Sequence, residues 1–257
     1  MQAKKSLGQN FLINENIIRN IISLIDYNDN DLIIEIGPGR GALSKYLSRF
    51  NCSYIAIEID KDMKSFLDPL NINVVYEDIL KTDLAQLLKK YNYERLFIIG
   101  NLPYYITSPI LEMLINSNID IYKMIFMVQK EVALRYSSKP GSKEYGYMSL
   151  FLQYGYDISK EFDVTKGNFN PVPKVDSSIV VLRKKEVDNP VNFKKYTTFL
   201  KDAFKMKRKT LKNNLKNYNW NAINKVLNEN GLNESIRAEN ISREIFLKIY
   251  KAIENDI

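Results

Sequence analysis

Short runs of apolar, mostly β-branched residues alternate along the chain with segments in which apolar residues recur at helical spacing. The runs have the length of buried strands, and the segments between them suit helices that pack on a sheet. The expected strands are residues 32–36, 54–59, 74–76, 96–100 and 124–128. The expected helices are residues 42–50, 61–67, 84–90 and 109–115. This alternation predicts an α/β fold with a parallel sheet.

The later part of the chain follows a different pattern. Residues 157–164 and 175–182 predict two more strands, too close together for a helix between them, and therefore an antiparallel hairpin at the sheet edge. Residues 184–192 are polar and resemble a linker. Apolar residues then recur at helical spacing over residues 193–204, 222–227 and 245–253. We therefore expect an α/β domain over residues 1–185 and a small helical domain over residues 186–257.

Positive charge is concentrated in the C-terminal part. Residues 1–183 contain 21 basic and 21 acidic side chains, whereas residues 184–257 contain 16 basic and 9 acidic ones, which is the whole net charge of +7. A basic module on a neutral remainder favours a polyanionic partner, although drift of composition in a Lys- and Asn-rich chain is the alternative. The densest run, expected to contact RNA phosphates unless it is only a solvated helix face, contains Lys205, Lys207, Arg208, Lys209 and Lys212.

Several classes of chemistry are excluded by what the sequence lacks. It contains no histidine and a single cysteine, Cys52, so Ser-His-Asp and Cys-His catalysis, histidine-ligated metals and an internal disulfide are ruled out. No apolar run approaches the roughly 20 residues of a membrane span. Lys4 and Lys5 are not followed by the apolar core of a secretory signal. We expect a cytoplasmic protein without a metal or a membrane contact.

A glycine-rich turn follows the first expected strand. Gly37 and Gly39 belong to Glu-Ile-Gly-Pro-Gly-Arg-Gly, in which glycines let the backbone approach a ligand closely. Glu58 ends the next strand, 21 residues after Gly37, where an acid meets ribose hydroxyls. Asp78, after the third strand, could accept a hydrogen bond from the adenine amine of a bound cofactor, although a turn or helix-cap role is equally compatible. The pattern predicts a nucleoside-cofactor site, with a structural turn and a surface carboxylate as the alternative.

The most specific motif, Asn101-Leu102-Pro103-Tyr104, follows the fourth strand. The side-chain oxygen of Asn101 and a carbonyl such as that of Leu102 can accept both hydrogens of a planar amine. Pro103 stiffens the turn, and Tyr104 offers a ring on which a base can stack. The motif therefore predicts a pocket for an unstacked base whose amine is the reacting group. A strand-ending turn with a packing tyrosine is the alternative.

Asn-Leu-Pro-Tyr resembles the motif of the rRNA adenine N6-dimethyltransferases, and the resemblance extends over nearly the whole chain. It includes Leu-Gly-Gln-Asn-Phe-Leu at residues 7–12, Phe-Asn-Pro-Val-Pro-Lys-Val-Asp-Ser at 169–177, and Arg-Ala-Glu-Asn-Ile-Ser at 237–242, followed by Phe246. The resemblance implies a Rossmann-like methyltransferase sheet with S-adenosylmethionine as cofactor. It implies cofactor contacts at Asn10, Leu12, Gly37, Glu58, Asp78 and Asn101. It also suggests Phe169 as a second aromatic wall opposite Tyr104, with a plain hydrophobic plug as the alternative.

Two branches of that family differ in substrate. The housekeeping branch, whose loss gives kasugamycin resistance, dimethylates two adjacent adenosines in a loop near the 3′ end of small-subunit (16S) rRNA. The erythromycin-resistance branch acts on large-subunit (23S) rRNA and more often has Asn in the place of Asp176. Pro-Lys-Val-Asp-Ser and Arg-Ala-Glu are similar to the housekeeping branch. The implied partner is small-subunit rRNA or an immature 30S particle, bound by a monomer during subunit biogenesis.

Three other functions remain open at this point. A nicotinamide dehydrogenase shares the glycine turn and the acid, but it has no use for Asn101–Tyr104. An RNA-binding assembly factor would keep the basic segment without needing an amine pocket. A DNA adenine methyltransferase would use the same chemistry on another nucleic acid. For methyl transfer itself we expect direct attack of the amine, without a covalent enzyme intermediate.

Overall fold

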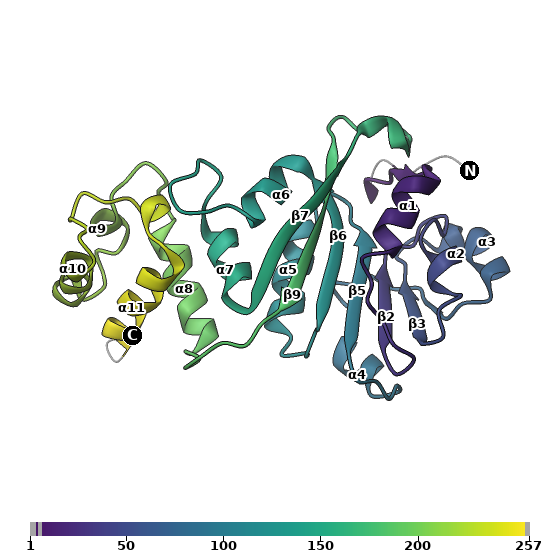
Figure 1. Ribbon diagram of the computed structural model, residues 1–257, viewed down its shortest axis with the longest axis horizontal. Coiled ribbons are helices and arrows are strands. Elements are labelled where there is room, and N and C mark those ends of the chain that lie inside the picture. Colours follow the sequence, from purple (N-terminus) through teal and green to yellow (C-terminus); the bar gives the residue numbers. More distant parts are fainter. Residues whose placement is uncertain (1–3, 5–6, 255–257) are drawn as a thin grey trace. The chain divides into compact units, whose positions relative to one another are not determined.

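The computed structural model describes residue 4 and residues 7–254. Within them, seven strands form one sheet in the order β4-β3-β2-β5-β6-β9-β7 (Figure 1). The strands are β2 (Leu32–Ile36), β3 (Ser53–Ile57), β4 (Val74–Val75), β5 (Leu96–Asn101), β6 (Lys123–Gln129), β7 (Tyr156–Val164) and β9 (Ser177–Lys184). The pairs from β4 to β6 are parallel, and β9 runs antiparallel to β6. The alternating pattern of the sequence is thus confirmed as an α/β fold.

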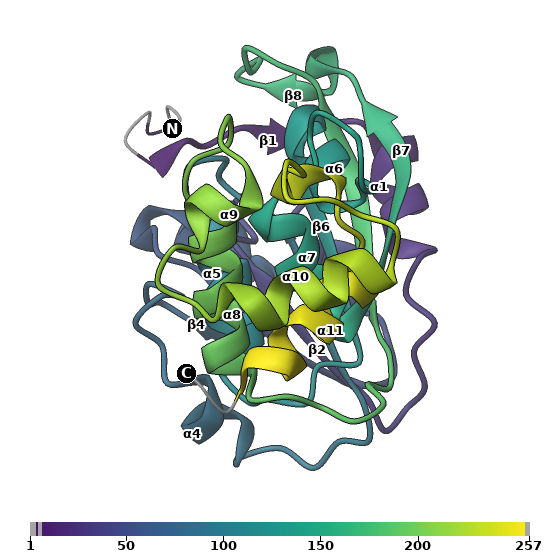
Figure 2. The same cartoon turned by 90° about the vertical axis from the view of Figure 1, so that its left-hand side faces the viewer.

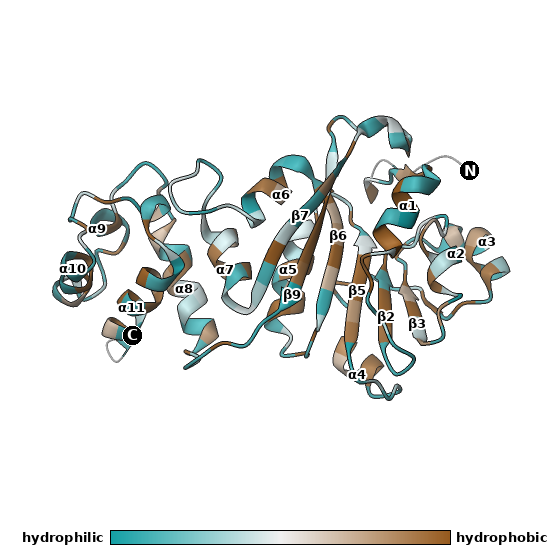
Figure 3. Ribbon diagram, in the orientation of Figure 1, coloured by the Kyte–Doolittle hydropathy of each residue, from teal (hydrophilic) through white to brown (hydrophobic). Residues whose placement is uncertain are grey.

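Along the chain, helices alternate with the parallel strands. They are α2 (Ser44–Leu47), α3 (Lys64–Leu67), α4 (Leu84–Leu88) and α5 (Thr107–Asn116), while α1 (Glu15–Ile22) precedes the sheet. All five residues of β2 are buried, as are the first five of β5, because helices cover both faces of a parallel sheet. In β7 exposed residues alternate with less exposed ones, and Figure 3 shows this strand as more hydrophilic than its neighbour β9. That difference fits its place at the edge.

The carboxyl ends of β2 and β5 approach each other closely. A Cβ atom on Gly100 would lie 2.5 Å from the carbonyl oxygen of Ile36, so no other residue fits there without a shift of the backbone. The register pairs Ile36 with Gly100. The turn after β2 and the motif after β5 therefore share one edge of the sheet, which is where ligands bind in open α/β folds.

The N-terminal arm forms a small separate sheet. Strand β1 (Phe11–Leu12) pairs antiparallel with β8 (Phe169–Asn170), and Leu12 stands opposite Phe169. Strand β8 and a short 3-10 helix, η4 (Lys166–Asn168), lie between β7 and β9 in the chain. Strands β7 and β9 are neighbours at the sheet edge, as expected, but the pairing of β8 with β1 was not anticipated.

The chain divides into two compact units, one of residues 1–133 and 159–184 and the other of residues 134–158 and 185–257. The second unit begins again at Lys185, close to the expected boundary, but it also contains residues 134–158, which the sequence analysis had placed in the first domain. The reason lies in packing. Tyr145 and Leu150 are buried in one apolar cluster with residues of the C-terminal helices. The hydroxyl of Tyr145 donates a hydrogen bond to the carbonyl oxygen of Ile241 (3.1 Å).

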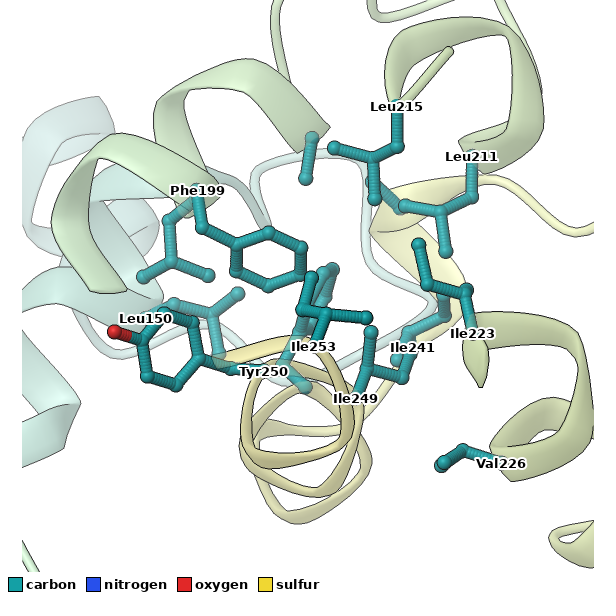
Figure 4. Close-up of a cluster of buried hydrophobic side chains, with 14 of the residues drawn as sticks. Leu150, Phe199, Leu211, Leu215, Ile223, Val226, Ile241, Ile249, Tyr250 and Ile253 are labelled. Carbon is teal, nitrogen blue, oxygen red and sulfur yellow. The ribbon is translucent and has the colours of Figure 1, made fainter. Parts of the chain in front are cut away.

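The second unit is helical. Its helices include α7 (Tyr147–Gly155), α8 (Phe193–Ala203), α9 (Leu211–Asn214), α10 (Trp220–Glu229) and α11 (Arg243–Ile253), and α6 (Lys130–Tyr136) enters it. Helices α10 and α11 pack against each other (Figure 2). Figure 4 shows how Phe199, Tyr250 and Ile253 meet in the core of this unit. Among the described residues no helix is long and apolar enough to cross a membrane.

Candidate active site

The turn after β2 is built from glycines in the left-handed region. Gly37 has a φ of +68° and Gly39 a φ of +54°, conformations that other residues rarely adopt. A Cβ atom on Gly39 would lie 3.0 Å from the ring of Phe11, so the N-terminal arm rests directly on this turn. Both the conformation of the turn and the close contact with Phe11 therefore favour glycine at position 39.

Glu58 is joined to the glycine turn by a hydrogen bond. One carboxylate oxygen accepts from the backbone N–H of Gly39 (2.9 Å), and the other accepts from the backbone N–H of Asp60 (2.8 Å). The side chain is buried, and burial raises the pKa of Glu58. Each carboxylate oxygen has a second lone pair, so Glu58 can still accept hydrogen bonds from two vicinal hydroxyls.

A cavity joins the glycine turn, Glu58 and the motif after β5. Ten of the residues predicted for the site line it: Asn10, Leu12, Gly37, Gly39, Glu58, Asp78, Asn101, Leu102, Pro103 and Tyr104. Asp78 also makes the turn contact that was its alternative interpretation, because its Oδ1 atom accepts from the N–H of Leu80 (3.0 Å). Among the described residues there is no group of three or more side chains that could hold a metal ion.

The amide of Asn101 has a defined orientation. Its Nδ2 atom donates to the backbone carbonyl of Asn10 in the N-terminal arm (3.0 Å). The Oδ1 atom is therefore the one left to accept a hydrogen bond within the cavity. The side chain of Leu102 is buried, so this residue can serve a ligand only through its backbone.

Tyr104 is half-buried, and its hydroxyl is fixed at the start of β9. The distance to the hydroxyl oxygen of Ser177 is 2.8 Å, and Ser177 is fully buried. The carbonyl of Pro103 accepts from the backbone N–H of Ile106 and from the hydroxyl of Thr107, both at 3.1 Å, which starts α5 directly after the motif. The ring of Tyr104 is thus held at the cavity wall by contacts at both ends of the residue.

Comparison with known proteins assigns this arrangement to a family. A family model described as ribosomal RNA adenine dimethylase matches residues 1–255. The chain belongs to this family. The recognition made from the four sequence motifs is confirmed.

The relatives agree with this assignment. The ribosomal RNA small subunit methyltransferase A of Mycoplasma mycoides subsp. mycoides is 40% identical, over 98% of both chains. The protein of the same name from Ligilactobacillus salivarius is 40% identical, over 97% of this chain and 90% of its own. A crystal structure of a dimethyladenosine transferase from Plasmodium falciparum is 27% identical with a TM-score of 0.80, over 95% of this chain and 98% of the other. The 23S rRNA methyltransferase ErmE is 22% identical with a TM-score of 0.74, over 95% and 100%, and confirms the fold alone.

Phe169 does not join the other predicted residues of this dimethylase site. It is 2% exposed and belongs to the apolar cluster that contains Leu12, Val164 and Ile179, and it is not among the described residues that line the cavity. In this conformation it fills the core beneath the N-terminal arm, which is the alternative considered for it. A role as a second aromatic wall stays a prediction.

Sequence reasoning missed Arg40, the one basic side chain among the described residues that line the cavity. Its guanidinium carbon lies 4.4 Å from the ring centre of Phe11 and 5.4 Å from that of Phe66, within the range of cation–π attraction. Its place between two glycines of the turn was the available signal. Gln9 and Asp60 were also missed, and their contacts are described below.

Glu35, the first residue of the glycine motif, is a second buried acid beside Glu58 in the lining of the cavity, and it is 2% exposed. It accepts hydrogen bonds from the hydroxyls of Ser44 (2.7 Å) and Tyr54. Burial raises its pKa from 4.5 to about 7. Because the folded state holds this proton more tightly than the unfolded chain, stability is lost as the pH rises through the range between these two pKa values.

In the parent, the free energy of unfolding should fall by about 3 kcal/mol between about pH 4.5 and pH 7. In the Glu35→Gln variant this fall should be absent. Glutamine keeps an acceptor for both hydroxyls but does not titrate. Urea unfolding of parent and variant at about pH 5 and pH 8 measures the difference. Parallel pH profiles of the two proteins would contradict the assignment.

The basic run lies in the loop between α8 and α9 of the second unit and at the start of α9. The side chains of Lys205, Lys207, Arg208, Lys209 and Lys212 are exposed. Lys212 forms an ion pair with Glu234 (2.6 Å), and Lys207 donates to the backbone carbonyl of Lys143 (2.8 Å). Residues 205–209 therefore form a turn, and Lys212 lies on a helix.

Proposed function

We propose that this dimethylase transfers methyl groups from S-adenosylmethionine to N6 of two adjacent adenosines near the 3′ end of small-subunit rRNA. The orientation of Asn101 carries the proposal. With Nδ2 bonded to the N-terminal arm, Oδ1 is an acceptor at the edge of the glycine-lined cavity, where it meets the N–H groups of an adenine amine. The curated relatives cited above carry the name small subunit methyltransferase, which favours this branch over the alternative, methylation of large-subunit rRNA.

The lining of the cavity fits the proposed cofactor. Glu58 presents a carboxylate to ribose hydroxyls, and Asp78 presents one to the adenine amine of the cofactor. S-adenosylmethionine supplies an electrophilic methyl group on a sulfonium. Asn101 and the carbonyl of Leu102 hold the target amine, Tyr104 stacks on the target base, and the protein contributes mainly by position. No imidazole exists in the chain to accept the proton, so we expect solvent to take it.

The cofactor assignment predicts that Glu58→Ala weakens binding by about 1.5–3 kcal/mol, the scale of hydrogen bonds to a charged group. Titration calorimetry with S-adenosylhomocysteine measures the affinity without turnover. Glu94→Ala, which removes an exposed carboxylate at the other end of β5, is the control and should not change it. Equal affinities of the Glu58 variant and the parent would remove Glu58 from the site.

We also propose that the second unit binds RNA through the basic run. Neutralising Lys207, Arg208 and Lys209 together should weaken RNA binding and flatten the plot of log affinity against log salt, by up to about 0.7–0.9 per lost phosphate contact. Neutralising Lys225, Lys248 and Lys251, which are exposed on α10 and α11, makes the same charge change and is the control. Similar salt slopes for the two triple variants would show that the run has no special role.

Radiolabelled methyl transfer to isolated small and large ribosomal subunits, followed by nucleoside analysis, tests the whole proposal. We expect label in dimethyladenosine of the small subunit. Label in the large subunit would favour the erythromycin-resistance reaction, and label only in DNA would favour a DNA adenine methyltransferase. If no label appears, stabilisation by a nicotinamide cofactor would favour the dehydrogenase, and binding to RNA alone would favour the assembly factor. Methylation of naked rRNA, measured in parallel, tests whether the substrate is the 30S particle. Measurement of the molecular mass of the free and the RNA-bound protein tests whether it is a monomer. A ribosomal substrate agrees with the cytoplasmic location expected from the sequence.

A further inference from the structure

Asp60, a buried carboxylate two residues after Glu58, ties the N-terminal arm to the cofactor side of the cavity. It is 3% exposed. Its Oδ2 atom accepts from Nε2 of Gln9 (2.7 Å), and its Oδ1 atom accepts from the ammonium of Lys4 (2.6 Å) and from the N–H of Asp62 (3.1 Å). Although burial alone would raise it, the contacts with Lys4 and Gln9 hold the pKa of Asp60 below its ordinary value. Asp60 is therefore an ionised anchor.

The same contacts continue to both halves of the site. The backbone N–H of Asp60 donates to Glu58 (2.8 Å), and Glu58 in turn accepts from the glycine turn. On the other side, Gln9 is covalently followed by Asn10, whose carbonyl accepts from Nδ2 of Asn101 (3.0 Å). An unbroken series of contacts thus joins the carboxylate proposed for the cofactor ribose to the amide proposed for the target amine.

The orientation of the Asn101 amide depends on this series. The last torsion of an asparagine is broad and nearly two-fold, so the side chain itself hardly distinguishes its oxygen from its nitrogen. If the carbonyl of Asn10 is not in place, the amide can rotate and present N–H groups to the target amine, which also offers N–H groups. The arm must therefore be docked for Oδ1 to face the base, and Gln9 docks it on Asp60.

We propose that Asp60 and Gln9 are positioning residues for methyl transfer: by docking the N-terminal arm, they set the orientation of the Asn101 amide. This rests on the proposed function. The bond from Gln9 ends on a buried carboxylate and is charge-assisted, so it is stronger than a bond between neutral groups. The effect should appear in the rate of the chemical step, because the backbone bond from Asp60 to Glu58 is kept whatever side chain stands at position 60.

An exchange of partners tests the proposal. Asp60→Asn keeps one oxygen, which faces the two donors Lys4 and the N–H of Asp62, so its amide nitrogen is turned toward Nε2 of Gln9 and two N–H donors stand opposite each other. Gln9→Glu places two carboxylates opposite each other. The double variant restores one donor and one acceptor, and the new Glu carboxylate can still accept from the backbone N–H of Lys4 (2.8 Å in the parent). Asp62→Asn is the control, since Asp62 also pairs with Lys4 (2.6 Å) but does not contact Gln9.

Single-turnover methylation at saturating cofactor and RNA is measured together with S-adenosylhomocysteine affinity and the Tm. We expect each single variant to slow methyl transfer by about tenfold or more, a barrier increase of about 1.4 kcal/mol. Cofactor affinity should fall by a smaller factor than the rate, because the contact of Glu58 with the glycine turn is kept, although Asn10 and Leu12 of the arm also line the cavity. The double variant should regain most of the rate, and Asp62→Asn should behave as the parent.

Three results would overturn the proposal. The first is parent-like rates in Asp60→Asn and Gln9→Glu. The second is a double variant as slow as the single variants. The third is losses of rate that follow losses of Tm throughout, because a merely structural contact gives that pattern. Failure of the proposed function is distinct, since in that case the parent protein itself would not methylate RNA.

Discussion

Replacement of Asn101 by alanine is expected to slow methyl transfer by about 10²–10³-fold, the loss seen when one oriented hydrogen-bonding group is removed from a reacting centre. The fold should be unaffected, because Asn101 is the last residue of β5 and is only partly buried. Single-turnover methylation with saturating RNA and cofactor measures the rate. Asn116→Ala, at the exposed end of α5, removes an amide outside the cavity and is the control. A parent-like rate in the Asn101 variant would rule out the proposed hydrogen bond between Asn101 and the target amine.

The same reaction, measured over a range of RNA concentrations, distinguishes the role of Tyr104 from that of Asn101. Tyr104→Ala removes the stacking ring and should weaken binding of the target base by about 1–3 kcal/mol. The KM for RNA should therefore rise more than the dissociation constant of the cofactor. Tyr104→Phe keeps the ring and loses only the contact with Ser177, so it should retain most of the affinity. If the alanine and phenylalanine variants behave alike, the ring is not a stacking surface.

The framework of this site was open to prediction because local sequence determines it. Strand β2 has the expected bounds, since an apolar run is confined between Asp31 and the glycine turn. Glu58 directly follows β3 and Asn101 ends β5, and the carboxyl ends of these parallel strands meet at one edge of the sheet. Residue type and spacing were therefore enough to bring both into one cavity.

What could not be predicted depends on contacts between distant parts of the chain. The bond from Asn101 to Asn10 joins residues 91 positions apart, and the bond from Gln9 to Asp60 spans 51. No periodicity encodes such pairs. Phe169 illustrates the same limit, because the pairing of β8 with β1 brings it opposite Leu12, with which it is buried in one apolar cluster. Helix α7 was missed since its sequence is apolar on nearly all sides and lacks an amphipathic pattern.

Cells that lack this protein should contain small-subunit rRNA without the two adjacent dimethyladenosines near its 3′ end. A loop is a reasonable target because its bases unstack at little cost and expose their edges. After the first transfer, N6 keeps one hydrogen, so one of the contacts to Asn101 and Leu102 must be given up. The pocket must then accept a methyl group where a hydrogen bond was. We therefore expect monomethyladenosine as an intermediate and dimethyladenosine as the product.

Mass spectrometry of rRNA from the deletion strain, and from the same strain carrying the parent gene or the Asn101→Ala gene, measures both nucleosides. The parent gene should restore dimethyladenosine to the small subunit, whereas the variant should not. A slow enzyme that still reaches the site within a generation would leave monomethyladenosine, so this nucleoside reports any residual activity of the variant. If the small subunit is unchanged and a large-subunit adenosine loses its methyl groups instead, the chain acts on the substrate of the other branch.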